Sequence, residues 1–317
     1  MAGPIRYRDV LDARERIRPW LAPTPLATHK ELDRETGAKV LVKHEEQNPT
    51  RSFKARNGLA VLTALGPGAG VVAATRGNHG LGVAWAGSRL GVPVTICVPR
   101  GNSPFKNAAI RELGAELVEE GKDYDESVIV MRRLVQERGL REVHSTNEPL
   151  VIAGAGTMTL EIAEQADQLD AMVVAVGGGS QAVGALTVLR ERRPDVKVYG
   201  VQAAGAAAIH DSWHARTPLT KASADTFADG LATRMSYELT FPALCEGLAD
   251  FVTVTDTEIA DALRTLRRIT GTAPEGAGAA GLAGLRKLGL SGQTVAIVIS
   301  GANIDADVLQ RVLEGRL

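Results

Sequence analysis

Short apolar runs alternate with longer amphipathic stretches along almost the whole chain, and this alternation most limits what the chain can fold into. Runs such as 71-VVAAT-75, 172-MVVAVG-177 and 294-TVAIVIS-300 are nearly continuous in Val, Ile and Ala, which is typical of strands covered on both faces. The stretches between them, such as 124-YDESVIVMRRLVQERG-139, have the apolar spacing of helices. The sequence therefore predicts an α/β fold with mostly parallel sheets flanked by helices. Further strands are expected at 40–45, 93–99, 116–120, 197–203 and 251–255.

The order of these elements indicates two domains rather than one. A length of 317 residues favours two, because domains hold roughly 100–200 residues each. One strand–helix series opens at the strand near 71 and ends near His144, and a second runs from near 153 to the end. Residues 204–232 stand apart as a polar segment, which we expect to be loop and turn.

Charge and composition exclude several classes of protein. The formal net charge is −1 and aromatic residues make up 4% of the chain, so there is neither a basic excess nor a stacking platform for nucleic acid. The two cysteines, Cys97 and Cys245, are too few for a disulfide framework, and we expect buried free thiols. No signal peptide or membrane-length apolar run is visible. We therefore expect a cytoplasmic protein that binds a small molecule, with neither nucleic acid nor membrane as a partner.

Three glycine-rich clusters follow predicted strands, and they are 75-TRGNHG-80, 177-GGGSQAVG-184 and 300-SGANID-305. Open α/β sheets bind ligands where strands end, so these clusters predict a composite pocket for a small molecule. In the second cluster, successive glycines leave main-chain N–H groups unshielded, and a helix starting near Gln181 would point its positive end there. This combination favours a bound phosphate or carboxylate over a turn that needs glycine only for close packing.

Two other patterns suggest sites that their context does not support. Residues 276-GAGAAG-281 match G-x-G-x-x-G, but a helix and a loop precede them rather than a strand, and no acidic residue follows about 20 positions on. A dinucleotide site is therefore not expected. His210 and His214 have an i, i+4 spacing that can hold a metal on a helix. Because their segment reads as polar loop, we favour solvated histidines.

Lys54 lies in 48-NPTRSFKARNG-58, at what looks like the start of a helix. An isolated lysine is usually a solvated charge. A lysine that is partly buried and desolvated can instead act as a nucleophile or form a Schiff base with a carbonyl compound. Because Lys54 directly follows Ser52 and Phe53, it is a candidate for this second role.

Five motifs occur together in a recognisable order, and they are NPTRSFKARNG, ATRGNHG, GGGSQAVG, APEGAGAAG and VISGANID. In order and spacing they resemble those of the serine/threonine dehydratase branch (threonine ammonia-lyase-like) of fold type II pyridoxal-phosphate enzymes, the tryptophan-synthase-β fold type. The similarity spans the chain from 24-TPL-26 onward. It implies two open, mostly parallel twisted sheets, with pyridoxal 5′-phosphate bound between a small domain at 66–148 and a large domain at 1–65 and 149–317. It also implies a homodimer.

The resemblance assigns roles to individual residues. Lys54 matches the lysine that is covalently bound to the cofactor and then takes the proton from the α-carbon of the substrate. Phe53 matches the residue that packs on the pyridine ring, and Gly230 leaves room on the other face. The other residues that match the cofactor site are Asn78 at the 3′-oxygen, Gly177, Gly178, Gly179 and Ser180 at the phosphate, Glu275 near the oxygen side and Ser300 at the pyridine nitrogen. The substrate site would comprise Ser52, Thr75, Arg76, Gly77, Asn78 and His79, with the loop amides receiving the α-carboxylate.

The activity that the resemblance implies is α,β-elimination. A β-hydroxy amino acid of the threonine, serine or hydroxyaspartate type would be converted into a 2-oxo acid and ammonia. Ser300 supports this expectation, because a neutral hydroxyl at the pyridine nitrogen gives a weaker electron sink than a carboxylate and so favours loss of the β-substituent. Alternatives are a dehydratase of another hydroxylated compound such as hydroxyectoine, an amino-acid racemase, a β-replacement synthase, and a catalytically idle cofactor-binding regulator.

Two departures from the family pattern affect these expectations. Arg76 stands where relatives often carry Ser or Ala, and racemase-like members use that serine as a base, a role that a guanidinium cannot take. Arg76 either pairs with a surface carboxylate or enters the pocket and binds a substrate carboxylate. Gln202 and Ala208 stand where metal-activated relatives carry an acidic pair. We therefore expect no divalent cation there, and we assign no metal site.

Overall fold

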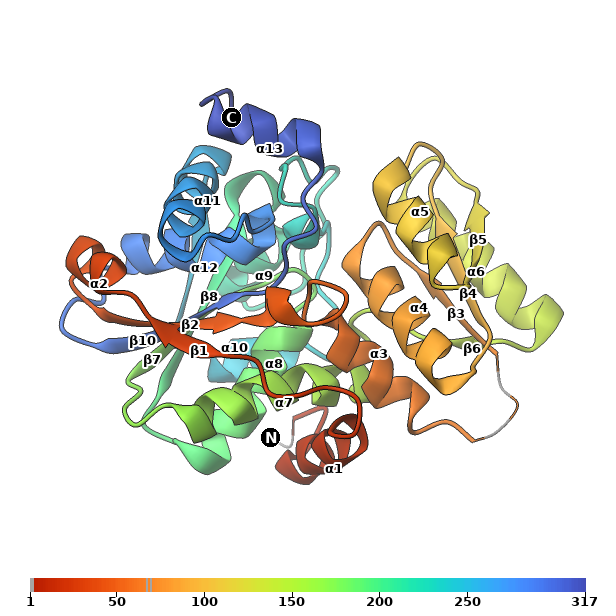
Figure 1. Ribbon diagram of the computed structural model, residues 1–317, viewed down its shortest axis with the longest axis horizontal. Coiled ribbons are helices and arrows are strands. Elements are labelled where there is room, and N and C mark those ends of the chain that lie inside the picture. The colour runs from red at the N-terminus through yellow and green to blue at the C-terminus, as the bar shows by residue number, and fades with distance from the viewer. Residues whose placement is uncertain (1–2, 67, 69) are drawn as a thin grey trace.

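The computed structural model describes residues 3–66, 68 and 70–317, and it contains two sheets in two bodies that lie side by side (Figure 1). One sheet has six strands in the order β1-β2-β10-β7-β8-β9, and the other has four in the order β5-β4-β3-β6. Neighbouring strands are parallel except β1 and β2, which are antiparallel. The strands are β1 (Leu26–Thr28), β2 (Lys39–His44), β3 (Val71–Ala74), β4 (Val94–Val98), β5 (Glu116–Glu119), β6 (Arg141–Glu142), β7 (Ala171–Ala175), β8 (Lys197–Ala203), β9 (Asp250–Val254) and β10 (Thr294–Ile299).

These sheets confirm the predicted α/β fold class. Each predicted strand is present, and its ends agree with the prediction to within two residues. The sequence pattern does not reveal β1 or β6. They span three and two residues, and so few residues show no strand pattern in the sequence. These two strands form because they pair with a neighbouring strand.

Helices cover both faces of the six-stranded sheet. Helices α1, α3, α7 and α8 share one apolar core with Met172 and Val174, whereas α11 and α12 share another with Val173. These three residues belong to β7, and successive residues of a strand point to opposite faces of the sheet. Because helices cover both faces, β7 is apolar at every position. The helices are α1 (Tyr7–Ile17), α2 (Lys30–Thr36), α3 (Lys54–Leu62), α4 (Asn78–Leu90), α5 (Pro104–Glu112), α6 (Tyr124–Arg138), α7 (Pro149–Gln165), α8 (Ser180–Arg192), α9 (Ala208–Ala215), α10 (Phe241–Gly247), α11 (Asp256–Thr270), α12 (Gly276–Leu288) and α13 (Ala306–Leu313), with short 3-10 turns η1 (Glu45–Gln47), η2 (Ala204–Ala206) and η3 (Asp229–Leu231).

Helix α3 lies between the two bodies and carries the candidate lysine at its first position (Figure 1). It crosses α4 with the two backbones in contact. A Cβ on Gly58 would lie 2.3 Å from the carbonyl oxygen of Gly82, and one on Gly82 would lie 2.2 Å from that of Lys54. Glycine is therefore required on both helices, and the crossing itself helps to place Lys54.

The four-stranded sheet and its helices form the second body, on the right in Figure 1. Every strand of this sheet lies within residues 66–148, which is the range expected for the small domain. However, one apolar core includes residues of both bodies, such as Leu59 of α3 and Ile96 of β4. The division of the chain into two domains therefore stays a prediction.

The prediction of loop and turn for residues 204–232 is wrong at 208–215, where α9 forms. Ile209 and Trp213 are buried and lie four positions apart, so they give the helix an apolar face that the polar residues around them hide. His210 and His214 lie on this helix, with ring centroids 4.4 Å apart. Their ring nitrogens lie within hydrogen-bond distance of protein oxygens. Within the described part of the chain, no three or more metal-ligating side chains gather.

The two cysteines are free, as predicted, with Cys97 buried and Cys245 partly buried. Burial raises the pKa of the Cys97 thiol to about 11, so this thiol stays protonated at neutral pH and is a poor nucleophile. None of the described helices is both long enough and apolar enough to cross a membrane.

Candidate active site

Lys54 lies where α3 begins, and its surroundings lower its basicity. Burial lowers the pKa of its amine to about 8, against the opposing attraction of Glu275. The side-chain nitrogen lies 4.6 Å from the centroid of the Phe53 ring. A lysine with such a pKa holds a usable fraction of neutral amine at physiological pH, as a nucleophile or general base must. These surroundings support the role that the sequence suggests for Lys54.

Strand β10 ends beside this lysine. The N–H of Phe53 donates to the carbonyl oxygen of Ser300 at 3.1 Å, and Ser52 and Gly301 form an isolated bridge. Ser300 is nearly buried. The fold thus brings together the first and the last of the five sequence motifs.

Asn78 is held by two hydrogen bonds from different segments. Its Nδ2 donates to Oε1 of Glu275 at 2.6 Å, and its Oδ1 accepts from Nδ2 of Asn303 at 2.7 Å. Burial raises the pKa of Glu275, with Lys106 acting in the opposite direction. A Cβ on Gly301 would lie 2.6 Å from the Glu275 carboxylate, so a larger residue there would displace this carboxylate from its contact with Asn78. Sequence reasoning did not identify Asn303, although it lies within the VISGANID motif.

The glycine loop of residues 177–179 packs too closely against its neighbours to allow side chains. A Cβ on Gly177 would lie 2.1 Å from the carbonyl oxygen of Gly230, and one on Gly178 would lie 2.0 Å from the hydroxyl oxygen of Thr146. Both contacts come from segments distant in the chain. Close packing alone therefore requires glycine at these two positions.

The same loop leads into helix α8 and presents its N-terminus. Gly179 has a φ of +97°, a left-handed conformation that glycine adopts without strain, and α8 begins at Ser180. Thr233 and Thr240 donate hydrogen bonds to the carbonyl oxygens of the loop at 3.4 and 2.7 Å. The first N–H groups of a helix lack partners within it and attract anions. The loop therefore fits the phosphate-binding role that the resemblance implies.

The connection from β3 to α4 forms the candidate carboxylate site. The hydroxyl of Thr75 accepts from the N–H groups of Gly77 at 3.0 Å and of Gly80 at 3.3 Å. The Gly77 amide is therefore occupied. Asn78 and His79 lie in the first turn of α4, where N–H groups have no acceptor inside the helix. The N–H groups of Asn78 and His79 are therefore candidates for the carboxylate-binding role, which stays a prediction.

His79 is buried and neutral. Burial, together with the nearby Lys54 charge, lowers its pKa to about 3. Its Nε2 lies 2.9 Å from the carbonyl oxygen of Val143 and donates to it, which leaves Nδ1 as an acceptor. This Nδ1 has no hydrogen-bond partner among the residues that the structure describes. His79 can therefore accept a hydrogen bond inside the site, but it carries no charge there.

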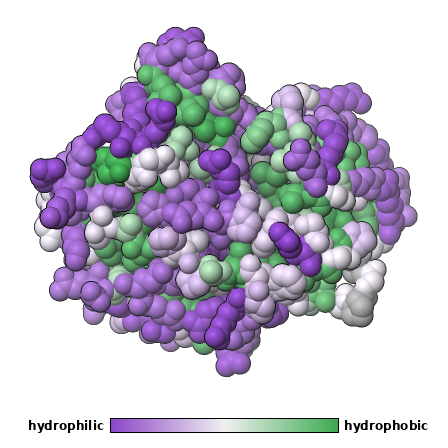
Figure 2. Space-filling view, in the orientation of Figure 1, coloured by the Kyte–Doolittle hydropathy of each residue, from purple (hydrophilic) through white to green (hydrophobic). Residues whose placement is uncertain are grey.

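Arg76 lies at the edge of the site, between the two bodies. Its Nη2 is 3.7 Å from Oδ1 of Asp229, and its side chain is 54% exposed. Lys106 is nearly buried and lies 3.1 Å from the other oxygen of the same carboxylate. Arg76 and Asp229 also line a cavity of about 600 Å³ between α5 and α13, where the molecular surface is indented (Figure 2). Arg76 thus has a carboxylate partner and also faces a space large enough for a ligand.

A buried charge network lies behind the lysine helix. Arg56 is 1% exposed and donates to the carboxylates of Glu45 and Glu161 over distances of 2.6–2.9 Å, and Lys43 donates to Glu161 at 2.7 Å. Burial alone would raise the pKa of Glu45, but Arg56 lowers it overall. Sequence reasoning did not identify this network. The available signal was the pair of charges, Lys43 and Glu45, inside an apolar strand pattern.

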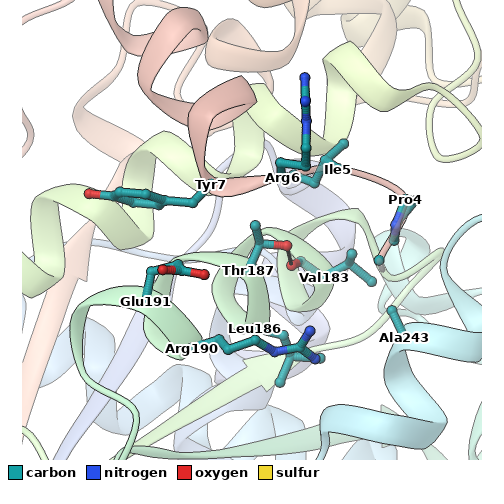
Figure 3. A pocket seen from close by; sticks show the side chains of 11 residues that line it. Pro4, Ile5, Arg6, Tyr7, Val183, Leu186, Thr187, Arg190, Glu191 and Ala243 are labelled. Atoms are coloured by element: carbon teal, nitrogen blue, oxygen red, sulfur yellow. Dashed lines mark hydrogen bonds between the residues drawn. The ribbon is translucent and has the colours of Figure 1, made fainter. Parts of the chain in front are cut away.

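Two other features lie outside this site. Figure 3 shows a groove of about 170 Å³ lined by Ile5 and Leu186 among others, and none of its described lining residues belongs to the candidate site. Gln202 is fully buried, and its side chain binds the N–H of His210 and the hydroxyl of Thr233. The amide of Gln202 thus has two protein partners.

The residues of the site fit pyridoxal 5′-phosphate. Lys54 offers an amine of lowered pKa for the aldehyde, and the N-terminus of α8 offers an anion site for the phosphate. Ser300 and Asn78 would hold the ring nitrogen and the phenolic oxygen, and hydrogen bonds tie both to the segment that precedes Lys54, Ser300 directly and Asn78 through Asn303.

Comparisons with known proteins identify the family to which the chain belongs. A model of the family described as pyridoxal-phosphate dependent enzyme matches residues 17–301. The L-threonine ammonia-lyase of Thermotoga maritima is 37% identical over 313 residues, which cover 98% of this chain and 78% of that protein. The L-threo-3-hydroxyaspartate ammonia-lyase of a Pseudomonas species is 34% identical over 314 residues, covering 98% of both proteins. The structure of maize serine racemase superposes with a TM-score of 0.93 at 27% identity, covering 99% of this chain and 98% of that one.

The family match runs from before the lysine helix to the end of β10, so it includes both Lys54 and Ser300. The two lyases match nearly the whole chain. The family resemblance noted in the sequence and the cofactor that it implies are therefore confirmed. This chain belongs to the family of pyridoxal-phosphate dependent enzymes.

Proposed function

We propose that this protein is an ammonia-lyase that eliminates water from a β-hydroxy amino acid and releases a 2-oxo acid and ammonia. The observation that carries the proposal is the pairing of a lysine whose pKa is about 8 with a serine, rather than a carboxylate, at the end of β10. A neutral partner for the ring nitrogen favours elimination over reactions that need a long-lived carbanion. The similarity to two ammonia-lyases that act on β-hydroxy amino acids supports the same reaction class.

Different residues of the site have different roles in this reaction. When bound, the cofactor supplies an electron sink for the electrons left on the α-carbon of the substrate. The amine of Lys54 takes the α-proton, for which its lowered pKa suits it. The N–H groups of Asn78 and His79 hold the α-carboxylate at the start of α4. The residues that would hold the cofactor are Phe53, Lys54, Asn78, Gly177, Gly178, Gly179, Ser180, Gly230, Glu275 and Ser300.

A substrate screen of the purified enzyme tests this proposal. We expect equal amounts of 2-oxo acid and ammonia from at least one member of a panel of L- and D-serine, L- and D-threonine and the 3-hydroxyaspartate diastereomers. Inversion of configuration without ammonia would instead identify a racemase. Product formation only after a thiol is added would identify a replacement enzyme, and cofactor binding with no turnover would support a regulator.

We further propose that the enzyme acts as a homodimer in the cytoplasm. The resemblance to the dehydratase branch supports the dimer, and the sequence, with its two free thiols, fits a reducing compartment. Sedimentation of the holoenzyme would test the assembly.

Replacing Arg76 with alanine tests which kind of substrate this enzyme takes. Arg76 has no hydrogen bond among the described residues, only the 3.7 Å contact with Asp229, so its planar fork is available for a second substrate carboxylate. If it binds one, we expect kcat/KM for 3-hydroxyaspartate to fall roughly thirtyfold in R76A, at about 1.4 kcal/mol per tenfold. The values for serine and threonine should change by less than about threefold.

The matched control for R76A is Arg111→Ala. Arg111 is also 54% exposed and also pairs with a carboxylate, that of Glu119, but it does not line the cavity at Arg76. We expect this control to leave all rates unchanged. An equal loss on every substrate would assign Arg76 to the α-carboxylate, and no loss on any would make it a surface ion pair.

A further inference from the structure

The side chain of Thr146 faces the glycine loop. Thr146 lies in the connection between β6 and α7, where the chain passes from one body to the other. It is 4% exposed, and its hydroxyl oxygen lies 2.0 Å from the point that a Cβ on Gly178 would occupy. The hydroxyl is therefore in contact with the loop itself. It makes no hydrogen bond to any residue in the described parts of the chain.

The main chain around Thr146 is fixed by His144. The Nδ1 of His144 accepts from the N–H of Thr146 at 2.9 Å and from that of Asn147 at 2.8 Å. Burial lowers the pKa of His144 to about 4, so the ring stays neutral and Nδ1 remains an acceptor at physiological pH. The Asn147 side chain accepts in turn from the N–H of Leu239. These hydrogen bonds fix the main chain that carries the Thr146 side chain beside the glycine loop.

Three threonines surround the glycine loop, and they differ in what their hydroxyls do. Thr240 donates to the carbonyl oxygen of Gly178 at 2.7 Å, and Thr233 contacts that of Gly177 at 3.4 Å. Both of these hydroxyls therefore donate their protons to carbonyl oxygens of the protein. The hydroxyl of Thr146 donates to none of the described residues, so its proton is available to a ligand held by the loop.

We propose that Thr146 is a phosphate-binding residue of the cofactor site, whose hydroxyl donates to the anion held by the glycine loop. A hydroxyl that donates to an ionised phosphate makes a charge-assisted hydrogen bond, which is stronger than one between neutral groups. The inference rests on the cofactor of the family and not on which reaction the enzyme performs. It concerns a residue that none of the five sequence motifs contains.

Ligand binding to the apoenzyme of Thr146→Val tests this proposal, because valine keeps the shape of threonine and removes the hydroxyl. We expect the dissociation constant of pyridoxal 5′-phosphate to rise roughly tenfold or more. The dissociation constant of pyridoxal, which lacks the phosphate, should stay unchanged. Thr146→Ser retains the hydroxyl and should bind both ligands within about threefold of the parent. The inhibition constant of inorganic phosphate, measured by its competition with the cofactor, should also rise in the valine variant.

The matched control is Thr187→Val on helix α8. Its hydroxyl donates to the carbonyl oxygen of Val183 at 2.9 Å (Figure 3), within the helix Ser180–Arg192. We expect this variant to bind both ligands normally. An equal loss of pyridoxal and pyridoxal 5′-phosphate affinity in Thr146→Val would overturn the proposal, as would no loss at all. Because the readout is binding, these outcomes can be distinguished from a failure of the proposed lyase activity.

Discussion

Replacing Lys54 with alanine is expected to lower kcat by on the order of a thousandfold, which is within the range for loss of a general base. Lys54 is the residue that we propose both to attach the cofactor and to take the α-proton. Its lowered pKa, about 8, has burial as its main cause. The measurement is the rate of 2-oxo acid formation on the best substrate of the screen, with the cofactor at saturation.

Borohydride reduction of the parent enzyme gives a second readout that does not depend on turnover. We expect the reduced cofactor on the peptide that contains Lys54 and no such adduct in K54A. The rate at which the apoenzyme captures the cofactor should rise with pH around the amine's pKa of about 8, because only the neutral amine attacks the aldehyde. The control is Lys122→Ala, whose side chain is 79% exposed and pairs with Glu126. An adduct on another lysine, or full activity in K54A, would refute the assignment.

Replacing Arg56 with methionine is expected to lower the free energy of unfolding by about 3–5 kcal/mol, because it leaves two buried carboxylates without their main partner. Arg56 is 1% exposed and binds Glu45 and Glu161 together. Lys43 is buried beside them and binds Glu161, but it has no hydrogen bond to Glu45 among the described residues. Urea unfolding of the holoenzyme, with the cofactor at a fixed concentration, measures the effect.

The matched control for Arg56 is Arg14→Met. Arg14 pairs with Glu164 on the same helix that carries Glu161, at 2.6 Å, but the two side chains are 34% and 40% exposed. Solvent screens such a pair, so we expect a loss of less than about 1 kcal/mol. If the two variants lost the same stability, the buried network would contribute no more than an ordinary surface pair.

Much of the fold could be predicted from the sequence because local chemistry decides it. Strands β3 and β7 are apolar throughout, and β10 is apolar after Thr294, since both faces of their sheets are covered. The glycine-rich segment after β7 likewise predicts a loop that leads into a helix. The error at 208–215 has a physical cause: the apolar face of α9 consists of few residues, and the polar ones between them dominate a local reading.

Most of the candidate site could also be predicted, because each part of it lies within one short motif. Lys54 and Ser300 were identified from motifs at opposite ends of the chain, and the fold places those motifs side by side. The role of Arg76 stayed open for the opposite reason. Its position in the loop is visible in the sequence, but its partner Asp229 belongs to another segment.

The sequence by itself determined the α/β class, the strands other than β1 and β6, and the motifs that we propose to hold the cofactor, because residue spacing and glycine content act over a few neighbouring positions. Only the tertiary structure decided the partners: Asn303 on Asn78, the Thr146 hydroxyl against Gly178, and the carboxylates around Arg56. Contacts between distant segments depend on how the sheets and helices dock. A buried charge or hydroxyl is tolerated only where the packing of sheets and helices brings its partners to it. These partners come from distant segments, so no local sequence pattern predicts them.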